Sequence, residues 1–244
     1  MTPTLAELYD VTEATWPPAD CRQIGPVTLR DGAGGGKRVS AATAGAGWST
    51  ASLAESEGAM MARGQTPLFM IRAGEEALDS ALDARGYGII DPVNLWLCPL
   101  GRLTDTPVPR VTAFAIWEPL AIMREIWARG GIGPDRVAVM ERAAMPKTGL
   151  FGRADDKAAG AGYCGLSGGT AMVHALEIQP EHRGKGLGKW MMRCAAFWAQ
   201  AQGGTHMAVL CTQANAAANG LYASLGMEVV GQYHYRIKTK DTAP

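Results

Sequence analysis

Apolar residues in the second half of the chain recur with two different periods, and the period separates strands from helices. Short alternating or continuous apolar runs predict strands over residues 148–153, 161–166 and 171–178. Turn-forming residues lie between these runs, at Asp155-Asp156-Lys157 and at Gly168-Gly169. We therefore predict an antiparallel meander of three strands in this region.

The residues after the meander follow the helical period. Apolar side chains fall on one face of a helix over residues 188–202, and Gly203-Gly204 is a stop signal. The same reasoning predicts, in chain order, a strand over 111–117, helices over 120–129 and 135–144, a strand over 206–212, a helix over 214–225 and a strand over 227–237. This mixed order, with antiparallel strands first, predicts the α+β class.

The segment over residues 103–109 is the best candidate for a domain linker, because it combines two prolines with small polar residues. It divides the chain into a predicted domain over residues 1–105 and a second domain over residues 106–244. A chain of 244 residues is long enough for two small domains or one large one.

The first half of the chain is similar to the end of the second half. A shift of 140 positions pairs Ile71 with Cys211 and Gly86 with Gly226 without a gap. This similarity favours an internal repeat of domain size. The competing interpretation is that any strand, helix, glycine and strand in succession would give the same pattern.

Composition excludes several classes of protein. With 47% hydrophobic and 19% charged residues the chain can bury a core, and no apolar run reaches the ~18 residues of a membrane span. The five cysteines are scattered, which argues against a disulfide framework or a metal site. Formal charge is about −5 over residues 1–105 and +5 over the rest, without the dense basic patch of a nucleic-acid binder. We expect a cytoplasmic protein that binds no metal, nucleic acid or membrane.

A glycine-rich segment between a predicted strand and a predicted helix carries the main candidate chemistry. The strand ends at Ile178, and the loop over residues 183–188 (RGKGLG) leads directly into the helix. Glycines let a ligand approach the backbone, and the first amides of a helix have no partner inside it. These amides favour a phosphate, and Arg183, Lys185 and Lys189 add positive charge. The segment therefore predicts an anion site.

Two other phosphate-binding loops do not fit this segment. A Walker A motif would require glycine in place of Arg183 and serine or threonine in place of Trp190. A dinucleotide-binding motif would require glycine in place of Lys189 and a parallel βαβ unit around it.

The remaining pattern, R-x-x-G-x-G between a strand and a helix, resembles the pyrophosphate-binding motif of the GNAT superfamily of acetyl-CoA-dependent acyltransferases. A second signature follows in the expected order: Asn215, Ala218, Leu221-Tyr222 and Leu225-Gly226-Met227 resemble the family's asparagine and tyrosine on a helix closed by Leu-Gly. The resemblance covers residues 110–238. It implies a mixed, mostly antiparallel sheet flanked by helices, and with the repeat it predicts two tandem domains of which the second is complete.

The resemblance also implies roles for individual residues. The strand that ends with Leu176, Glu177 and Ile178 would splay from the next strand, so that its backbone amides hold the pantetheine arm and the thioester carbonyl of acetyl-CoA. The pyrophosphate would lie on the loop and the first helical turn, and Asn215 would contact the pantetheine arm. Tyr222 would protonate the departing thiolate. The loop and helix residues are Arg183, Gly184, Lys185, Gly186, Leu187, Gly188 and Lys189.

Two residues are candidates for the general base that accepts the amine proton, Glu177 and His174. Strand alternation places them on opposite faces unless a bulge intervenes, and we prefer Glu177. Each candidate also has an interpretation without catalysis. Tyr222 would be a core residue, Glu177 a solvated strand end, and His174 a packed strand residue.

These residues favour an N-acetyltransferase that moves an acetyl group to an amine of a small molecule, peptide or protein. The alternatives are a non-catalytic acyl-CoA sensor and a structural protein. At a shift of 140 residues, Glu75 replaces Asn215, Leu82 replaces Tyr222, and the uncharged segment 43–48 replaces the loop. We therefore expect the first half to lack CoA binding and to support the structure, shape the acceptor cleft or mediate a homodimer.

Overall fold

The computed structural model describes residues 1–238 as two compact units, each assembled from separate stretches of the chain. Residues 239–244, the end of the predicted second domain, lie outside the described residues. The domains predicted over residues 1–105 and 106–244 stay a prediction. The two units are defined by which residues lie close in space, and this does not show whether the halves of the sequence arose as a repeat. The larger unit comprises Met1–Pro17, Leu95–Cys211 and Asn215–Val230, and the smaller one Pro18–Asn94, Thr212–Ala214 and the chain from Gly231.

The larger unit contains a mixed sheet in the order β5-β10-β9-β8-β7-β6. Its helices and strands are α1 (Leu5–Thr15), β5 (Tyr87–Pro99, from Leu95 onward), η1 (Leu100–Arg102), β6 (Ala113–Ile116), α5 (Ala121–Arg129), α6 (Pro134–Arg142), β7 (Lys147–Ala154), β8 (Lys157–Ser167), β9 (Thr170–Ile178), η2 (Pro180–His182), α7 (Leu187–Ala201), β10 (His206–Thr212), α8 (Ala216–Ser224) and β11 (Glu228–Lys238, up to Val230). The strands from β6 to β9 pair antiparallel and β9 pairs parallel with β10. The predicted meander and the α+β class are confirmed.

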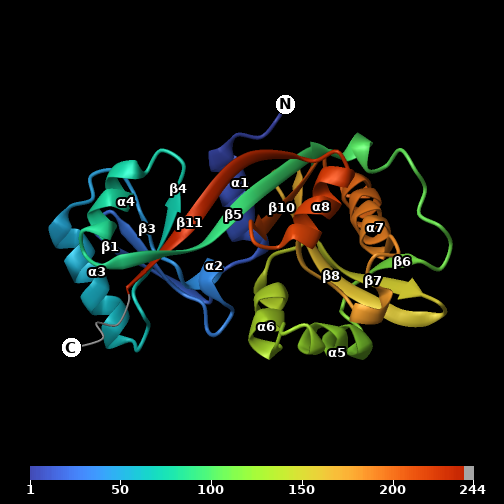
Figure 1. Cartoon of the computed structure of the whole chain (residues 1–244), viewed down its shortest axis with the longest axis horizontal. Coiled ribbons are helices and arrows are strands. Elements are labelled where there is room, and N and C mark those ends of the chain that lie inside the picture. The colour runs from blue at the N-terminus through green and yellow to red at the C-terminus, as the bar shows by residue number, and fades with distance from the viewer. Residues whose placement is uncertain (239–244) are drawn as a thin grey trace. The chain divides into compact units, whose positions relative to one another are not determined.

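Helices cover both faces of this sheet. In Figure 1, α7 lies on one side of β7 and β8, and α5 and α6 lie on the other. The helix α1 packs on β8 and β9. The apolar stripe of α7, with Leu187, Met191 and Ala195, joins Val173 of β9 in one core cluster. Leu8 and Val11 of α1 pack instead against Met172, the preceding residue of β9. Successive side chains of β9 in this part of the strand therefore point alternately to the α7 face and to the α1 face of the sheet.

The smaller unit has a separate core under two sheets. Its elements are β1 (Asp20–Ile24), β2 (Val27–Asp31), α2 (Lys37–Ser40), β3 (Thr43–Ala44), α3 (Thr50–Ala62), β4 (Leu68–Arg72), α4 (Glu76–Asp83), the first part of β5 and the last part of β11. One sheet has the order β1-β2-β3 and the other the order β4-β11-β5. Leu53, Phe69, Leu82 and Tyr87 are fully or almost fully buried in its core.

No helix among residues 1–238 has both the length and the hydrophobicity that a membrane span requires.

Each unit includes a strand from the other half of the sequence. In the larger unit β5, from the first half, neighbours β10. In the smaller unit β11, from the second half, pairs antiparallel with β4, with Tyr233 opposite Arg72 and Ile237 opposite Leu68. Neither half of the sequence alone supplies all the strands of one unit.

A network of ion pairs holds β11 to α4 inside the smaller unit. The guanidinium of Arg236 donates to both oxygens of Asp79, at 2.7 and 3.1 Å, to Asp83 at 2.6 Å and to the carbonyl of Tyr87 at 2.8 Å. His234 is bonded to Asp79 at 2.8 Å. The hydrogen bond from Arg236, followed by that from His234, holds the pKa of Asp79 below its ordinary value. Since Arg236 is almost fully buried, its removal leaves two carboxylates without their main partner.

We expect Arg236→Met to lower the free energy of unfolding by about 2 kcal/mol at neutral pH, less than for a fully buried pair because Asp79 is partly exposed. A lowered folded-state pKa stabilises the protein above the unfolded-state pKa of about 3.9, and this contribution is lost as the pH falls through the folded-state value. Urea unfolding should therefore show a difference between the variant and the wild type that narrows towards acidic pH. A pH-independent difference would contradict this account.

The matched control is Lys37→Met, which removes the ion pair between Lys37 and Asp91 at 2.5 Å in the same unit. Both side chains are more than 40% exposed, at 48% and 41%. An exposed pair contributes at most about 1 kcal/mol, so this variant should unfold close to the wild type.

Candidate active site

The backbone of β9 contains a bulge at Ala175. The residue adopts a φ of +51°, in the left-handed region that alanine rarely occupies. The pairing with β8 shifts register there: Tyr163 lies opposite His174, whereas Ala161 lies opposite Glu177. One extra residue on β9 therefore faces a shorter stretch of β8.

The bulge places both base candidates on the same face of the sheet. Before it, His174 contacts α1, and after it Glu177 packs against Gly130 at the end of α5. Leu176 and Ile178 turn to the opposite face and pack on the cluster around α7. The indole Nε1 of Trp127, a buried residue of α5, donates to the carbonyl of Ala175 at 2.8 Å. The bulge that would place His174 and Glu177 on one face, an exception to strand alternation considered from the sequence, is therefore present.

Next to the bulge, beyond Val173, β9 and β10 no longer pair. Their parallel pairing runs from Thr170 opposite His206 to Val173 opposite Val209. The strand β9 nevertheless continues to Ile178 and β10 to Thr212. The splay implied by the resemblance is thus present, and it opens the sheet beside the end of β9.

The loop after β9 folds as the glycine pattern predicts. Gly184 and Gly186 have φ values of +73° and +85°, and Gly186 is the N-cap of α7. No side chain caps this helix, and within residues 1–238 no group accepts a hydrogen bond from the amides of Leu187 or Gly188. An anion can bind these amides without displacing any protein group.

A cavity of about 700 Å³ opens over this loop. It is bounded by the end of β9, the loop, the first turn of α7 and one side of α8. Eleven of the thirteen predicted site residues line it: Leu176, Glu177, Ile178, Arg183, Gly184, Gly186, Leu187, Gly188, Lys189, Asn215 and Tyr222. The two signatures, separated by about 30 residues in the sequence, therefore meet in one cavity.

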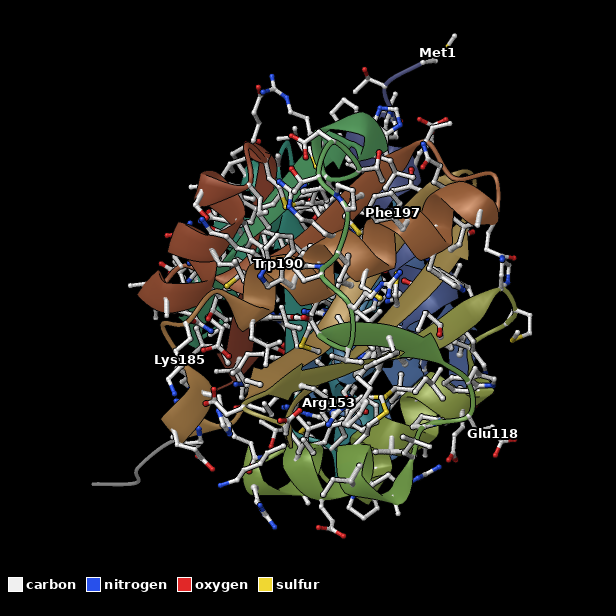
Figure 2. The ribbon with its side chains drawn as sticks, turned by 90° about the vertical axis from the view of Figure 1, so that its right-hand side faces the viewer. Met1, Glu118, Arg153, Lys185, Trp190 and Phe197 are labelled. Carbon is white, nitrogen blue, oxygen red and sulfur yellow. The ribbon has the colours of Figure 1, made fainter. Side chains whose placement is uncertain are left out.

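Two of the three predicted cationic side chains form ion pairs with carboxylates of the protein. Arg183 donates to Glu177 at 2.8 Å and to the carbonyl of Ile178 at 2.9 Å. Lys185 does not line the cavity and its Nζ lies 3.4 Å from Asp155, a residue of the turn between β7 and β8. Figure 2 shows Lys185 on the loop that precedes α7, which carries Trp190 and Phe197. Among the described residues Lys189 has no ion-pair partner.

The two predicted residues of α8 differ in their surroundings. Tyr222 is 6% exposed, and its ring packs against Trp96 at a centroid distance of 6.2 Å. Asn215 is exposed and caps α8, because its side chain accepts a hydrogen bond from the amide of Ala218 at 3.0 Å. Capping alone gives Asn215 a structural role, and its predicted contact with pantetheine stays a prediction.

His174 lies apart from the cavity lining. Its ring is 4% exposed, stacks on Trp16 at 4.9 Å and is bonded through Nε2 to the hydroxyl of Thr15 at 2.8 Å. Both partners belong to the first 17 residues, so nothing in the local sequence around His174 indicated its burial. Of the two base candidates, only Glu177 reaches the cavity.

The cavity also contains residues that the sequence reasoning did not assign. His182 lies directly before Arg183 and is buried. On α8 the additional lining residues are Ala217, Ala218, Gly220, Leu221 and Ser224. The helical spacing of these residues relative to Asn215 was a usable signal, since residues three or four apart share a face. No group of three or more metal-ligating side chains occurs among residues 1–238.

Comparison with known proteins agrees with this geometry. Over 96% of its length the chain is 28% identical to an uncharacterized N-acetyltransferase, YobR, of Bacillus subtilis, of which it covers 98%. The solved structure of a GCN5-related N-acetyltransferase from Kribbella flavida matches 98% of the chain and 97% of its own length, with a TM-score of 0.71 and 18% identity. A tandem GNAT protein from the clavulanic acid biosynthesis pathway matches 98% and 89%, with a TM-score of 0.61 and 13% identity.

A mixed sheet that splays beside a glycine-rich loop, with helices on both faces, is the GNAT-like α+β fold. Residues 120–227 match the family model of the acetyltransferase (GNAT) family. The general activity of the family is transfer of an acetyl group from acetyl-CoA.

Proposed function

We propose that this protein is an acetyl-CoA-dependent N-acetyltransferase that acetylates an amine of a small molecule, peptide or protein. The observation that carries the proposal is the cavity in which the glycine-rich loop, the splayed end of β9 and Tyr222 meet. In this proposal the pyrophosphate binds the amides at the start of α7 together with Arg183 and Lys189. The pantetheine arm follows the end of β9 past Asn215 towards Tyr222.

The proposed chemistry is a direct attack of the amine on the thioester. The amine nitrogen forms a bond to the acetyl carbonyl carbon, and backbone amides of the splayed strand stabilise the oxyanion. The carbon–sulfur bond then breaks, and the thiolate takes a proton from Tyr222. Glu177 accepts the proton that the amine loses. The guanidinium of Arg183 donates a hydrogen bond to the carboxylate of Glu177 at 2.8 Å. A phosphate that draws Arg183 away would therefore also free the carboxylate of the proposed base.

The first half is proposed to be a degenerate copy that binds no CoA. Its β4, α4 and β5 follow one another as β10, α8 and β11 do, and the shift of 140 residues pairs them in order. The fold match to a tandem GNAT protein supports two tandem domains. We propose a supporting role for this half, with acceptor-cleft shaping or homodimer formation as its further tasks. A cytoplasmic location and the absence of a metal, nucleic-acid or membrane partner stay predictions from composition.

A non-catalytic acyl-CoA sensor is the second candidate function. The ion pair between Glu177 and Arg183 favours it, since the carboxylate oxygen that Arg183 binds is not free to accept a proton from an amine. A sensor would bind acetyl-CoA but would release no free CoA with any amine. Thiol release with a panel of amines therefore separates the two functions.

Calorimetric titration should show that the wild type binds acetyl-CoA with one site per chain. The double variant Arg183→Glu, Gly186→Asp should lose binding at least a hundredfold, because it replaces a cation by an anion and adds a carboxylate to the phosphate loop. A loss of this size is about 2.7 kcal/mol.

The matched control is Arg136→Glu, a charge reversal at an exposed position of α6 that does not line the cavity. It should bind acetyl-CoA within about twofold of the wild type. Absence of binding to the wild type would overturn the acetyltransferase proposal. Two sites per chain would overturn the degenerate first half.

Tyr222→Phe should lower kcat by roughly a hundredfold or more, the usual contribution of a positioned general acid. The ring stays packed on Trp96, so the dissociation constant of acetyl-CoA should change by less than about threefold. Steady-state thiol release combined with calorimetry measures both quantities. Unchanged turnover would remove Tyr222 from the mechanism and leave the cavity assignment intact.

A further inference from the structure

His182 is a buried polar side chain at the edge of the anion site with an unsatisfied nitrogen. The residue is 6% exposed, ends the short turn η2, and lines the cavity next to Arg183. Its Nδ1 is enclosed by protein and has no hydrogen-bond partner among the described residues. Buried ring nitrogens are normally satisfied, so this atom requires an explanation.

Asp155 lies in position to supply the missing partner. Its Oδ2 is 3.7 Å from Nδ1 of His182, beyond hydrogen-bond distance but within ion-pair distance. The same oxygen is 3.4 Å from Nζ of Lys185. Asp155 and Asp156 have φ values of +52° and +58°, the pattern of a two-residue hairpin turn, which fixes the turn between β7 and β8. The carboxylate is therefore held by a hairpin beside the loop.

The other ring nitrogen of His182, Nε2, makes no hydrogen bond within residues 1–238. Unlike Nδ1, it is not enclosed by protein atoms. Because the residue lines the cavity, this is the nitrogen that a ligand can reach. A carboxylate that faces one ring nitrogen fixes the orientation of the ring and leaves the other nitrogen directed outward.

We propose that His182 is a further binding residue for the phosphate groups of acyl-CoA, donating from Nε2, and that Asp155 is its positioning residue. The inference rests on the proposed function, since it assigns a contact to the same cofactor. Protonation of His182 then strengthens cofactor binding. The charged groups around the ring are Asp155, Arg183, Lys185 and Glu181, with Glu177 bound to Arg183.

The test is calorimetric titration between about pH 6 and 8, the range in which histidine changes charge. The probe is 3′-dephospho-CoA. The 3′-phosphate of CoA itself changes charge at about pH 6, and its titration would be superimposed on that of the protein. The wild type should bind this probe roughly tenfold more tightly at the acidic end, which is about 1.4 kcal/mol. His182→Phe keeps a ring of similar size and should show no such dependence.

Three further variants separate a binding role from a structural one. His182→Gln serves if the phenylalanine variant does not fold, and it should also lose the pH dependence. Asp155→Asn should reduce the acidic gain to less than about threefold, because the ring loses the carboxylate that orients it toward the ligand. His206→Gln replaces a buried histidine outside the cavity, bonded to Thr205 at 2.9 Å, and should keep the full dependence.

Two results overturn the inference without affecting the proposed function. One is acetyl-CoA binding by the wild type with no pH dependence for 3′-dephospho-CoA, and the other is a dependence that persists in both His182 variants. Failure of the wild type to bind acetyl-CoA at any pH is a different outcome, because it rejects the proposed function itself.

Discussion

The candidate site depends on one residue, Ala175, at which β9 changes the direction of its side chains. The left-handed backbone there costs an alanine roughly 1 kcal/mol, and the hydrogen bond from Trp127 fixes the carbonyl in place. Without the bulge, Glu177 would face away from His174 and Leu176 would leave the α7 core. The irregularity lies two residues after Val173, the last residue of β9 that pairs with β10, so the opening in the sheet and the change in side-chain direction occur at the same place along the strand.

Charge compensation links the glycine-rich loop over residues 183–188 to the rest of the larger unit. Arg183 is held by Glu177 and Lys185 by Asp155, so the loop is largely neutralised by side chains from β9 and from a neighbouring hairpin. A polyanionic ligand must compete with these carboxylates, while the amides at the start of α7 stay available. In this arrangement the backbone supplies fixed donors and the cations adjust their partners.

Local sequence patterns were sufficient for the elements that form the site. Glycine pairs and apolar periodicity gave the meander, α7, β10 and α8 close to their observed bounds, because caps and turns are decided by nearby residues. Long-range pairing could not be obtained in this way. The exchange of β5 and β11 between the halves, and the burial of His174 under Trp16, join residues more than 100 positions apart. The roles proposed for His182 and Asp155 also depend on a hairpin that approaches the loop only in the folded chain.

Hydrogen–deuterium exchange in the presence and absence of acetyl-CoA tests the central claim most directly, since it locates binding on the backbone. The account predicts slower exchange over residues 176–189 and at the start of α8, where strand end, loop and helix surround the cavity. It predicts no change over residues 43–48, the segment of the first half that matches the loop after the shift of 140. Protection of residues 43–48, or none over residues 183–188, would contradict the assignment of the cavity to acetyl-CoA.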